Sequence, residues 1–155
     1  MDIDGVLNSH EKVINDYCGI KKECVDNFNY LINELKDNNS EKDKIDIIII
    51  SAWRYMILGG QMTLKGFEYL LLSHGVDCKD MLHGCTAVDD NISYAEAYSL
   101  PKEELEKRGL EMRRRQIYDY INKHTDIIQG GFIILDDLDL QMKRSFKIDG
   151  TVGLT

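Results

Sequence analysis

Asp2-Ile3-Asp4-Gly5-Val6-Leu7-Asn8 places two carboxylates one residue apart, followed by a glycine and an apolar pair. If Ile3 lies in an extended segment, the side chains of Asp2 and Asp4 point to the same side of the backbone. Gly5 then allows the chain to turn sharply, because it has no Cβ. Two carboxylates held in this way can share a divalent cation, or divide the roles of nucleophile and proton donor between them.

The composition indicates one soluble globular domain. A chain of 155 residues is long enough to bury a core, and its apolar content of 43% is ordinary. The formal net charge of -8 argues against stable binding to duplex nucleic acid, which needs clustered Lys and Arg. A local basic site remains compatible with this charge.

The cysteines and the hydropathy pattern bear on where the protein works. Cys18, Cys24, Cys78 and Cys85 show no C-x-x-C spacing, which favours reduced thiols in a cytoplasmic protein over a disulfide framework or a zinc site. No apolar run approaches the roughly 20 residues that a membrane span requires. We therefore expect a cytoplasmic protein without a membrane partner.

Apolar runs and helical periodicity alternate along the chain. The periodicity predicts helices over 22–36, 64–73 and 101–124, the last starting at Pro101 and interrupted at Gly109. Strands are predicted over 45–50, 81–83, 132–135 and 145–148, and a long loop over 84–100. Alternating strands and helices are typical of an α/β protein with a parallel sheet that is covered by helices on both faces.

Ligands of such sheets bind at the carboxyl ends of the strands, and polar residues follow each apolar run there. Ser51, Ala52, Trp53 and Arg54 follow 45–50, and Asp136, Asp137 and Asp139 follow 132–135. Carboxylates gathered with Asp2 and Asp4 at one edge would repel one another unless a cation lay among them. Since all these ligands are oxygens, we expect Mg²⁺ rather than zinc.

These residues together resemble the haloacid dehalogenase (HAD) phosphohydrolase superfamily. Its D-x-D-G motif matches Asp2-Ile3-Asp4-Gly5, its strand ending in Ser or Thr matches Ser51, and its acidic pair matches Asp136-Asp137. More narrowly, the chain looks like the HAD domains of "Swiss Army Knife" RNA-repair proteins. That resemblance spans nearly the whole chain and is carried by D-I-D-G-V-L-N, S-A-W-R, the R-x-x-x-I pattern at 113–117, L-D-D, H-G-C-T at 83–86 and V-G-L-T at 152–155.

The resemblance implies a role for each matching residue. Asp2 would be the nucleophile that forms an aspartyl-phosphate, and Asp4 would protonate the leaving oxygen and then activate water. The metal ligands would be Asp2, Asp4 through its backbone carbonyl, and Asp136 or Asp137. Ser51 would bind the phosphoryl group, and Arg113 would supply the basic residue, because its spacing to Ile117 favours it over Arg114 and Arg115, which are interpreted as solvated. Arg54 would contact substrate phosphate or close a surface ion pair, and Trp53 is as good a candidate for the core as for the site.

The resemblance also implies a fold and an activity. We expect a single HAD-like domain over 1–155, a three-layer Rossmannoid parallel sheet with little or no cap, lacking part of its first strand and its C-terminal helix. The expected function is Mg²⁺-dependent phosphomonoester hydrolysis, with nucleic-acid 3′-phosphate ends, nucleotides or other phosphorylated small molecules as substrates. A catalytically silent binding or regulatory module with the same fold is the alternative. A metal-dependent glycosyltransferase with a D-x-D motif is a further alternative, but it leaves Ser51 and Asp136-Asp137 unexplained.

Overall fold

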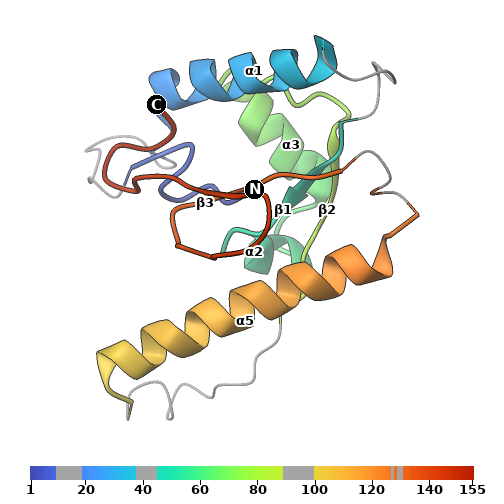
Figure 1. Cartoon of the computed structure of the whole chain (residues 1–155). Coiled ribbons are helices and arrows are strands. Elements are labelled where there is room, and N and C mark those ends of the chain that lie inside the picture. The colour runs from blue at the N-terminus through green and yellow to red at the C-terminus, as the bar shows by residue number, and fades with distance from the viewer. Residues whose placement is uncertain (10–18, 38–44, 89–99, 127, 129–130) are drawn as a thin grey trace.

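A computed structural model of the chain describes residues 1–9, 19–37, 45–88, 100–126, 128 and 131–155. Helices and short strands alternate along it (Figure 1). In chain order the elements are α1 (Lys22–Asp37), β1 (Ile47–Ile49), α2 (Arg54–Leu58), α3 (Leu64–Ser73), β2 (Leu82–Cys85), α5 (Lys102–Lys123), β3 (Ile134–Asp136) and β4 (Ser145–Lys147).

The predicted elements are present, and their bounds differ mainly at the strands. The prediction of α3 is confirmed to the residue, and α1 begins at the predicted Lys22. The predicted strands over 45–50 and 132–135 were too long at their starts, since β1 begins at Ile47 and β3 at Ile134. β2 extends to Cys85, two residues into the expected loop. Most of the remainder of that loop, 89–99, lies outside the described residues.

The interruption predicted at Gly109 was wrong, because α5 runs unbroken over 22 residues. A glycine inside a helix costs only about 1 kcal/mol. Two ion pairs one turn apart support the helix just before this glycine, Lys102 with Glu106 and Arg108 with Glu104. No helix in the described ranges, α5 included, is both long and apolar enough to cross a membrane.

The strands form two parallel pairs, β1 with β2 and β3 with β4. The first two residues lie between these pairs. The Met1 nitrogen donates to Ile48 O at 2.6 Å, and Ile50 N donates to Met1 O at 3.0 Å, which is the pattern of parallel pairing with β1. Asp2 N donates to Leu135 O of β3 at 2.9 Å. Asp2 therefore lies between the carboxyl ends of β1 and β3.

Helices pack against the strands from opposite sides (Figure 1). One group of buried side chains joins Val25, Phe28 and Ile32 of α1 and Phe67 and Leu71 of α3 to Ile3 and Ile49. A second group joins Ile117 of α5 to Ile50, Ile134, Leu140 and Met142. The C-terminal residues contact both α1 and the N-terminal segment, because Asn27 Nδ2 donates to Leu154 O at 3.1 Å and Leu154 N donates to Val6 O at 2.8 Å.

Candidate active site

Three carboxylates gather where β3 ends. One oxygen each of Asp2, Asp136 and Asp137 lies within 4.8 Å of the others. Asp2 is only 4% exposed, Asp136 is fully buried, and Asp137 is partly exposed. The carboxylate of Asp2 also accepts a hydrogen bond from Ile3 N at 2.8 Å, which fixes the orientation of the side chain.

Arg113 reaches this group from α5. Its Nη1 lies 3.1 Å from Asp136 Oδ2 and 3.4 Å from Asp2 Oδ2, and the side chain is 15% exposed. Burial raises the pKa of Asp136 to about 6 and repulsion from Asp2 adds to this rise, while the Arg113 guanidinium works against it. The group combines three carboxylates with one guanidinium, so its formal charge is negative.

Gly5 is required for the carboxylates to come this close. Its φ is +74°, and a Cβ built on it would lie 2.8 Å from Asp137 Cβ and 2.9 Å from Asp137 Oδ2. Gly5 N donates to Asn8 Oδ1 at 2.8 Å, which closes the turn. A side chain at position 5 would displace Asp137, because atoms of real side chains do not approach so closely.

Asp4 points to a different set of partners. Trp53 Nε1 lies 3.1 Å from Asp4 Oδ2 and 3.3 Å from Oδ1, and Asn8 Nδ2 donates to Oδ1 at 2.9 Å. The side chain of Asp4 is not part of the three-carboxylate group. The two aspartates of the D-x-D pair thus occupy different environments, as a division into nucleophile and proton donor requires.

Ser51 and Arg54 form the turn that follows β1. Ser51 is fully buried, and its Oγ accepts from Trp53 N at 3.4 Å. The Arg54 guanidinium donates to Ile50 O, to Ser51 O at 2.8 Å and to Gln116 Oε1 of α5 at 2.8 Å. The surface ion pair considered for Arg54 was wrong, because this residue is only 3% exposed and its charge is directed at backbone carbonyls.

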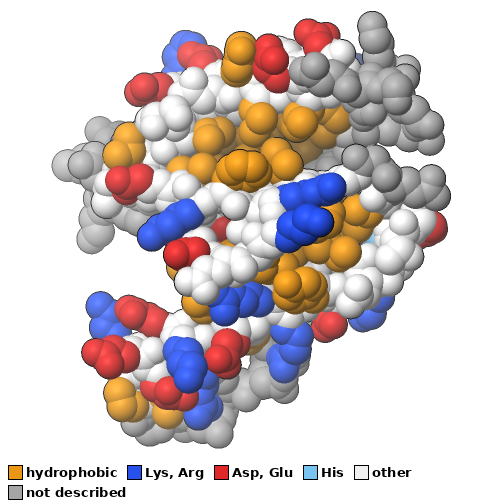
Figure 2. Space-filling model, in the orientation of Figure 1, with side chains coloured by type: hydrophobic (Ala, Val, Ile, Leu, Met, Phe, Trp, Pro, Cys, Tyr) orange, Lys and Arg blue, Asp and Glu red, His pale blue; other side chains and the backbone are white. Residues whose placement is uncertain are grey.

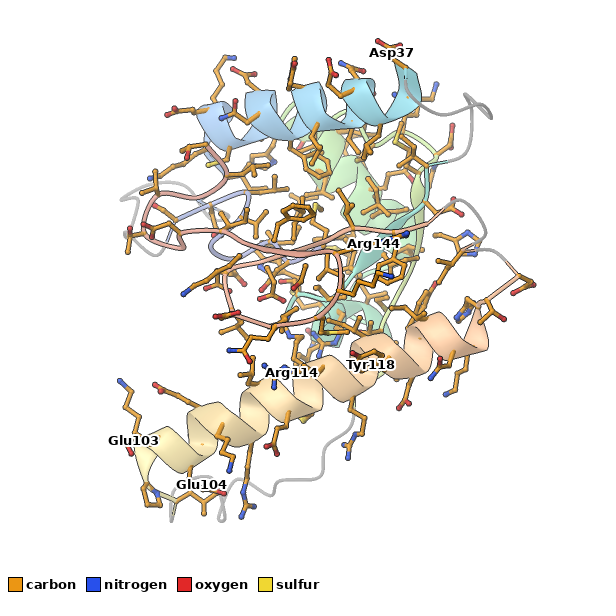
Figure 3. The ribbon with its side chains drawn as sticks, viewed as in Figure 1. Asp37, Glu103, Glu104, Arg114, Tyr118 and Arg144 are labelled. Carbon is orange, nitrogen blue, oxygen red and sulfur yellow. The ribbon has the colours of Figure 1, made fainter. Side chains whose placement is uncertain are left out.

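The neighbours of Arg113 differ from one another. Arg114, which Figure 3 shows on α5 beneath the strands, donates to the carbonyls of Leu140 and Asp139 in the loop after β3. Its interpretation as a solvated residue was therefore wrong. Arg115 is exposed. Of the three arginines, the structure thus places Arg113 against the carboxylates.

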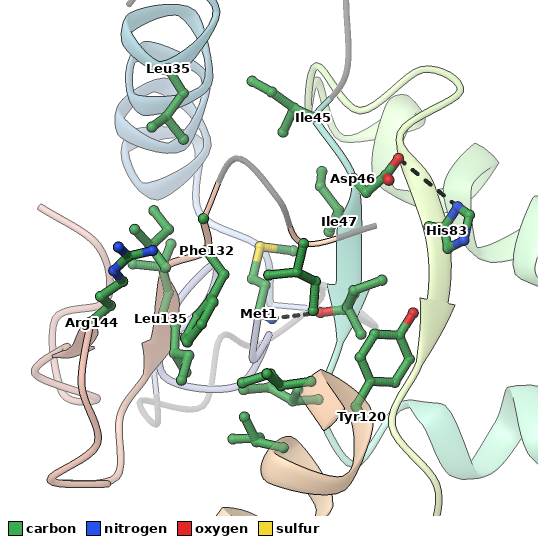
Figure 4. A pocket seen from close by; sticks show the side chains of 18 of the residues that line it. Met1, Leu35, Ile45, Asp46, Ile47, His83, Tyr120, Phe132, Leu135 and Arg144 are labelled. Carbon is green, nitrogen blue, oxygen red and sulfur yellow. Dashed lines mark hydrogen bonds and ion pairs between the residues drawn. The ribbon is translucent and has the colours of Figure 1, made fainter. Parts of the chain in front are cut away.

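A sizeable cavity among the described residues lies elsewhere. It has a volume of about 660 Å³ and is lined by side chains of α1, β1, α5 and β3, including Leu35, Ile47 and Tyr120, and by Phe132 just before β3 (Figure 4). On the face seen in Figure 2, hydrophobic side chains line the hollow below α1, and acidic and basic side chains alternate along the lower helix. None of the three clustered aspartates lines the cavity, so we do not place the chemistry there.

The family model for the HAD domain in Swiss Army Knife RNA repair proteins matches residues 1–155. The chain belongs to this family. No curated protein and no solved structure matches the chain. The family assignment confirms the resemblance carried by the motifs, and it supports an α/β fold and phosphohydrolase chemistry for this HAD domain.

The donor set of the HAD domain fits Mg²⁺. Within the described part of the chain it consists of three carboxylates and no nitrogen or sulfur ligand, which is the chemistry that hard divalent cations prefer. The absence of a Cβ at Gly5 also leaves space for Asp137 beside the backbone of the D-x-D-G turn. We therefore assign Asp2, Asp136 and Asp137 as the side chains that could hold the ion.

Sequence reasoning assigned no role to two side chains that organise the site of the HAD domain, Asn8 and Gln116. It left Trp53 undecided between the core and the site. Asn8 lies four residues after Asp4, and its proximity could have been found from the turn at Gly5. Gln116 contacts Arg54 across 62 residues of sequence, and no local pattern indicates such a pair.

Proposed function

We propose that this HAD domain is a Mg²⁺-dependent phosphomonoester hydrolase that acts through an aspartyl-phosphate on Asp2. The observation that carries the proposal is the group of Asp2, Asp136 and Asp137 with Arg113 bridging two of them at the carboxyl ends of the strands. The separate setting of Asp4, held by Trp53 and Asn8, supports different roles for the two aspartates.

In the proposed reaction an oxygen of Asp2 attacks the phosphorus atom, and the bond from phosphorus to the leaving oxygen breaks. Asp4 gives its proton to that oxygen. Asp4 then takes a proton from water, which attacks the phosphorus of the aspartyl-phosphate and releases inorganic phosphate and free Asp2. When bound, Mg²⁺ reduces the repulsion between the anionic nucleophile and the anionic phosphate.

We propose that Ser51 and Arg113 bind the phosphoryl oxygens. Ser51 follows β1 and Arg113 lies on α5, and both elements border Asp2. Arg54 was expected among the phosphate ligands. Its hydrogen bonds to the Ile50 and Ser51 carbonyls and to Gln116 favour an indirect role, in which Arg54 holds the turn that presents Ser51.

The proposed substrates are phosphorylated polynucleotide ends, 3′-phosphates among them, or nucleotides. Membership in an RNA-repair family supports the first choice, and the net charge of -8 argues for contact with an end rather than with a long duplex. We further propose one three-layer domain over 1–155 with little or no cap, supported by the packing of α1 and α3 opposite α5. A cytoplasmic location accords with the free thiols of Cys24, Cys78 and Cys85.

The test is hydrolysis of p-nitrophenyl phosphate with and without Mg²⁺ by the wild type, Asp2→Asn and Asp26→Asn. Asp26 is an exposed aspartate paired with Lys22, so its variant controls for the loss of one negative charge. We expect Mg²⁺-dependent turnover by the wild type and Asp26→Asn and none by Asp2→Asn. Mg²⁺ binding without turnover by the wild type would instead identify the non-catalytic module. A panel of phosphorylated oligonucleotides and nucleotides then identifies the substrate.

A further inference from the structure

The carboxylate of Asp4 is held by two donors from different parts of the chain. Trp53 Nε1 contacts both of its oxygens, at 3.1 and 3.3 Å, and Asn8 Nδ2 donates to one of them at 2.9 Å. Among the interactions of the described residues, Arg113 contacts Asp2 and Asp136 but not Asp4. The direction of the Asp4 side chain therefore depends on neutral donors.

Both donors are themselves fixed. The Trp53 ring packs against Phe67 of α3, with ring centroids 5.7 Å apart, and Phe67 is fully buried. The side-chain oxygen of Asn8 accepts from Gly5 N, so the amide cannot turn without opening the turn that follows the D-x-D pair. A carboxylate with one donor can rotate about its broad terminal torsion, whereas two fixed donors select one orientation.

Trp53 also contacts the other side of the proposed site. Its backbone N–H lies 3.4 Å from Ser51 Oγ, while its indole N–H contacts Asp4. One residue thus links the hydroxyl proposed to bind the phosphoryl group to the carboxylate proposed to protonate the leaving oxygen.

We infer that Trp53 is a positioning residue, which sets the direction of the Asp4 carboxylate relative to Ser51. The inference rests on the proposed function, because it assigns Trp53 a role in that same reaction. Proton transfer requires hydrogen-bond distance between Asp4 and the leaving oxygen. A displacement of 1 Å is enough to cost about 100-fold in rate.

The kinetic test compares two substrates, because a proton donor matters most for a poor leaving group. Trp53→Phe keeps the ring on Phe67 and removes the indole N–H. For this variant we expect kcat/KM for an alkyl phosphate such as glycerol phosphate to fall by about 10- to 100-fold. For p-nitrophenyl phosphate, whose leaving group departs without a proton, we expect a change of less than about threefold. kcat/KM is the right quantity because it reports the steps up to aspartyl-phosphate formation, before Asp4 acts on water.

Tyr55→Phe, which removes the hydroxyl of a residue that is 47% exposed, should leave both values unchanged. If the wild type does not hydrolyse p-nitrophenyl phosphate, the proposed function itself fails. If Trp53→Phe lowers both substrates equally, or neither, the positioning role of Trp53 fails while the proposed function stands.

A second test does not depend on activity. Trp53 is the single tryptophan of the chain, so a ¹⁵N-labelled sample gives one indole N–H resonance. We expect Asp4→Asn to shift this resonance, and Asp26→Asn to leave it in place. An indole resonance that does not respond to Asp4→Asn would overturn the inference.

Discussion

Gly5→Ala tests whether the glycine of the D-x-D-G motif is needed to bring Asp137 into the site. Gly60 provides a matched control, because its φ of +73° nearly equals the +74° of Gly5 while a Cβ at Gly60 would meet no atom within 4 Å. Both alanines are strained by the left-handed backbone. Only the alanine at position 5 also overlaps Asp137, at 2.8 Å from its Cβ.

The expected free energies follow from this difference. The left-handed conformation costs a non-glycine residue about 1–2 kcal/mol, and both variants should lose this much stability. Overpacking against Asp137 adds about 1–3 kcal/mol for Gly5→Ala alone. Because the overlap is relieved by moving Asp137, we also expect the Mg²⁺ affinity of Gly5→Ala to fall by about 10- to 100-fold, the usual loss when the support of a metal ligand is disturbed.

Urea unfolding without metal measures the stability difference, and titration calorimetry measures Mg²⁺ binding. We expect Gly60→Ala to bind Mg²⁺ as the wild type does. Equal losses of stability in the two variants, together with unchanged Mg²⁺ affinity of Gly5→Ala, would refute the claim that close packing at Gly5 holds Asp137 in place.

Three further predictions concern the charges of the site. Burial raises the pKa of Asp136 from 3.8 to about 6, so protonated Asp136 stabilises the metal-free fold below about pH 4, and this contribution of about 3 kcal/mol is lost as the pH rises through about 6. Between pH 5 and 7.5, the free energy of unfolding measured in urea should fall more for the wild type than for Asp136→Asn. Equal decreases in the two proteins would contradict the prediction. The Arg113→Met variant should lose hydrolysis but bind Mg²⁺ more tightly in calorimetry, because the carboxylates then lack their bridging cation. Weaker binding of Mg²⁺ by this variant would show that Arg113 supports the metal site instead. Arg54→Leu should lower the free energy of unfolding by about 3–5 kcal/mol in urea titrations, because buried acceptors lose a charged donor. The control Arg108→Leu, which removes an exposed ion pair, should lower it by less than about 1 kcal/mol. Similar decreases in stability for the two variants would argue against the buried role of Arg54.

The parts of the fold that could be predicted from the sequence are those with a local cause. The spacing of apolar residues in α1 and α3 is enough to place both helices, because one face of each is buried. The position of Asp136 after a wholly apolar run predicted a strand end, and β3 does end there. α2 has five residues, fewer than helical periodicity needs to be recognised.

The parts of the site that could not be predicted depend on distant partners. The charge of Arg54 predicts an exposed side chain, and its burial is explained only by the Ile50 and Ser51 carbonyls and by Gln116, 62 residues away. Trp53 lies 49 residues from Asp4, so the contact between them depends on the parallel register that brings Met1 and Asp2 beside β1. Residue type and spacing indicate the chemistry of the aspartates, but the tertiary fold determines which donors orient them.

Chemical trapping of the aspartyl-phosphate shows whether Asp2 becomes phosphorylated during turnover. The wild type is quenched during Mg²⁺-dependent turnover of p-nitrophenyl phosphate and treated with borohydride, which reduces an aspartyl-phosphate to homoserine, and the modified residue is located by peptide mass spectrometry. We expect homoserine at position 2, dependent on both Mg²⁺ and substrate. Turnover without modification of Asp2, or modification at another residue, would contradict this expectation.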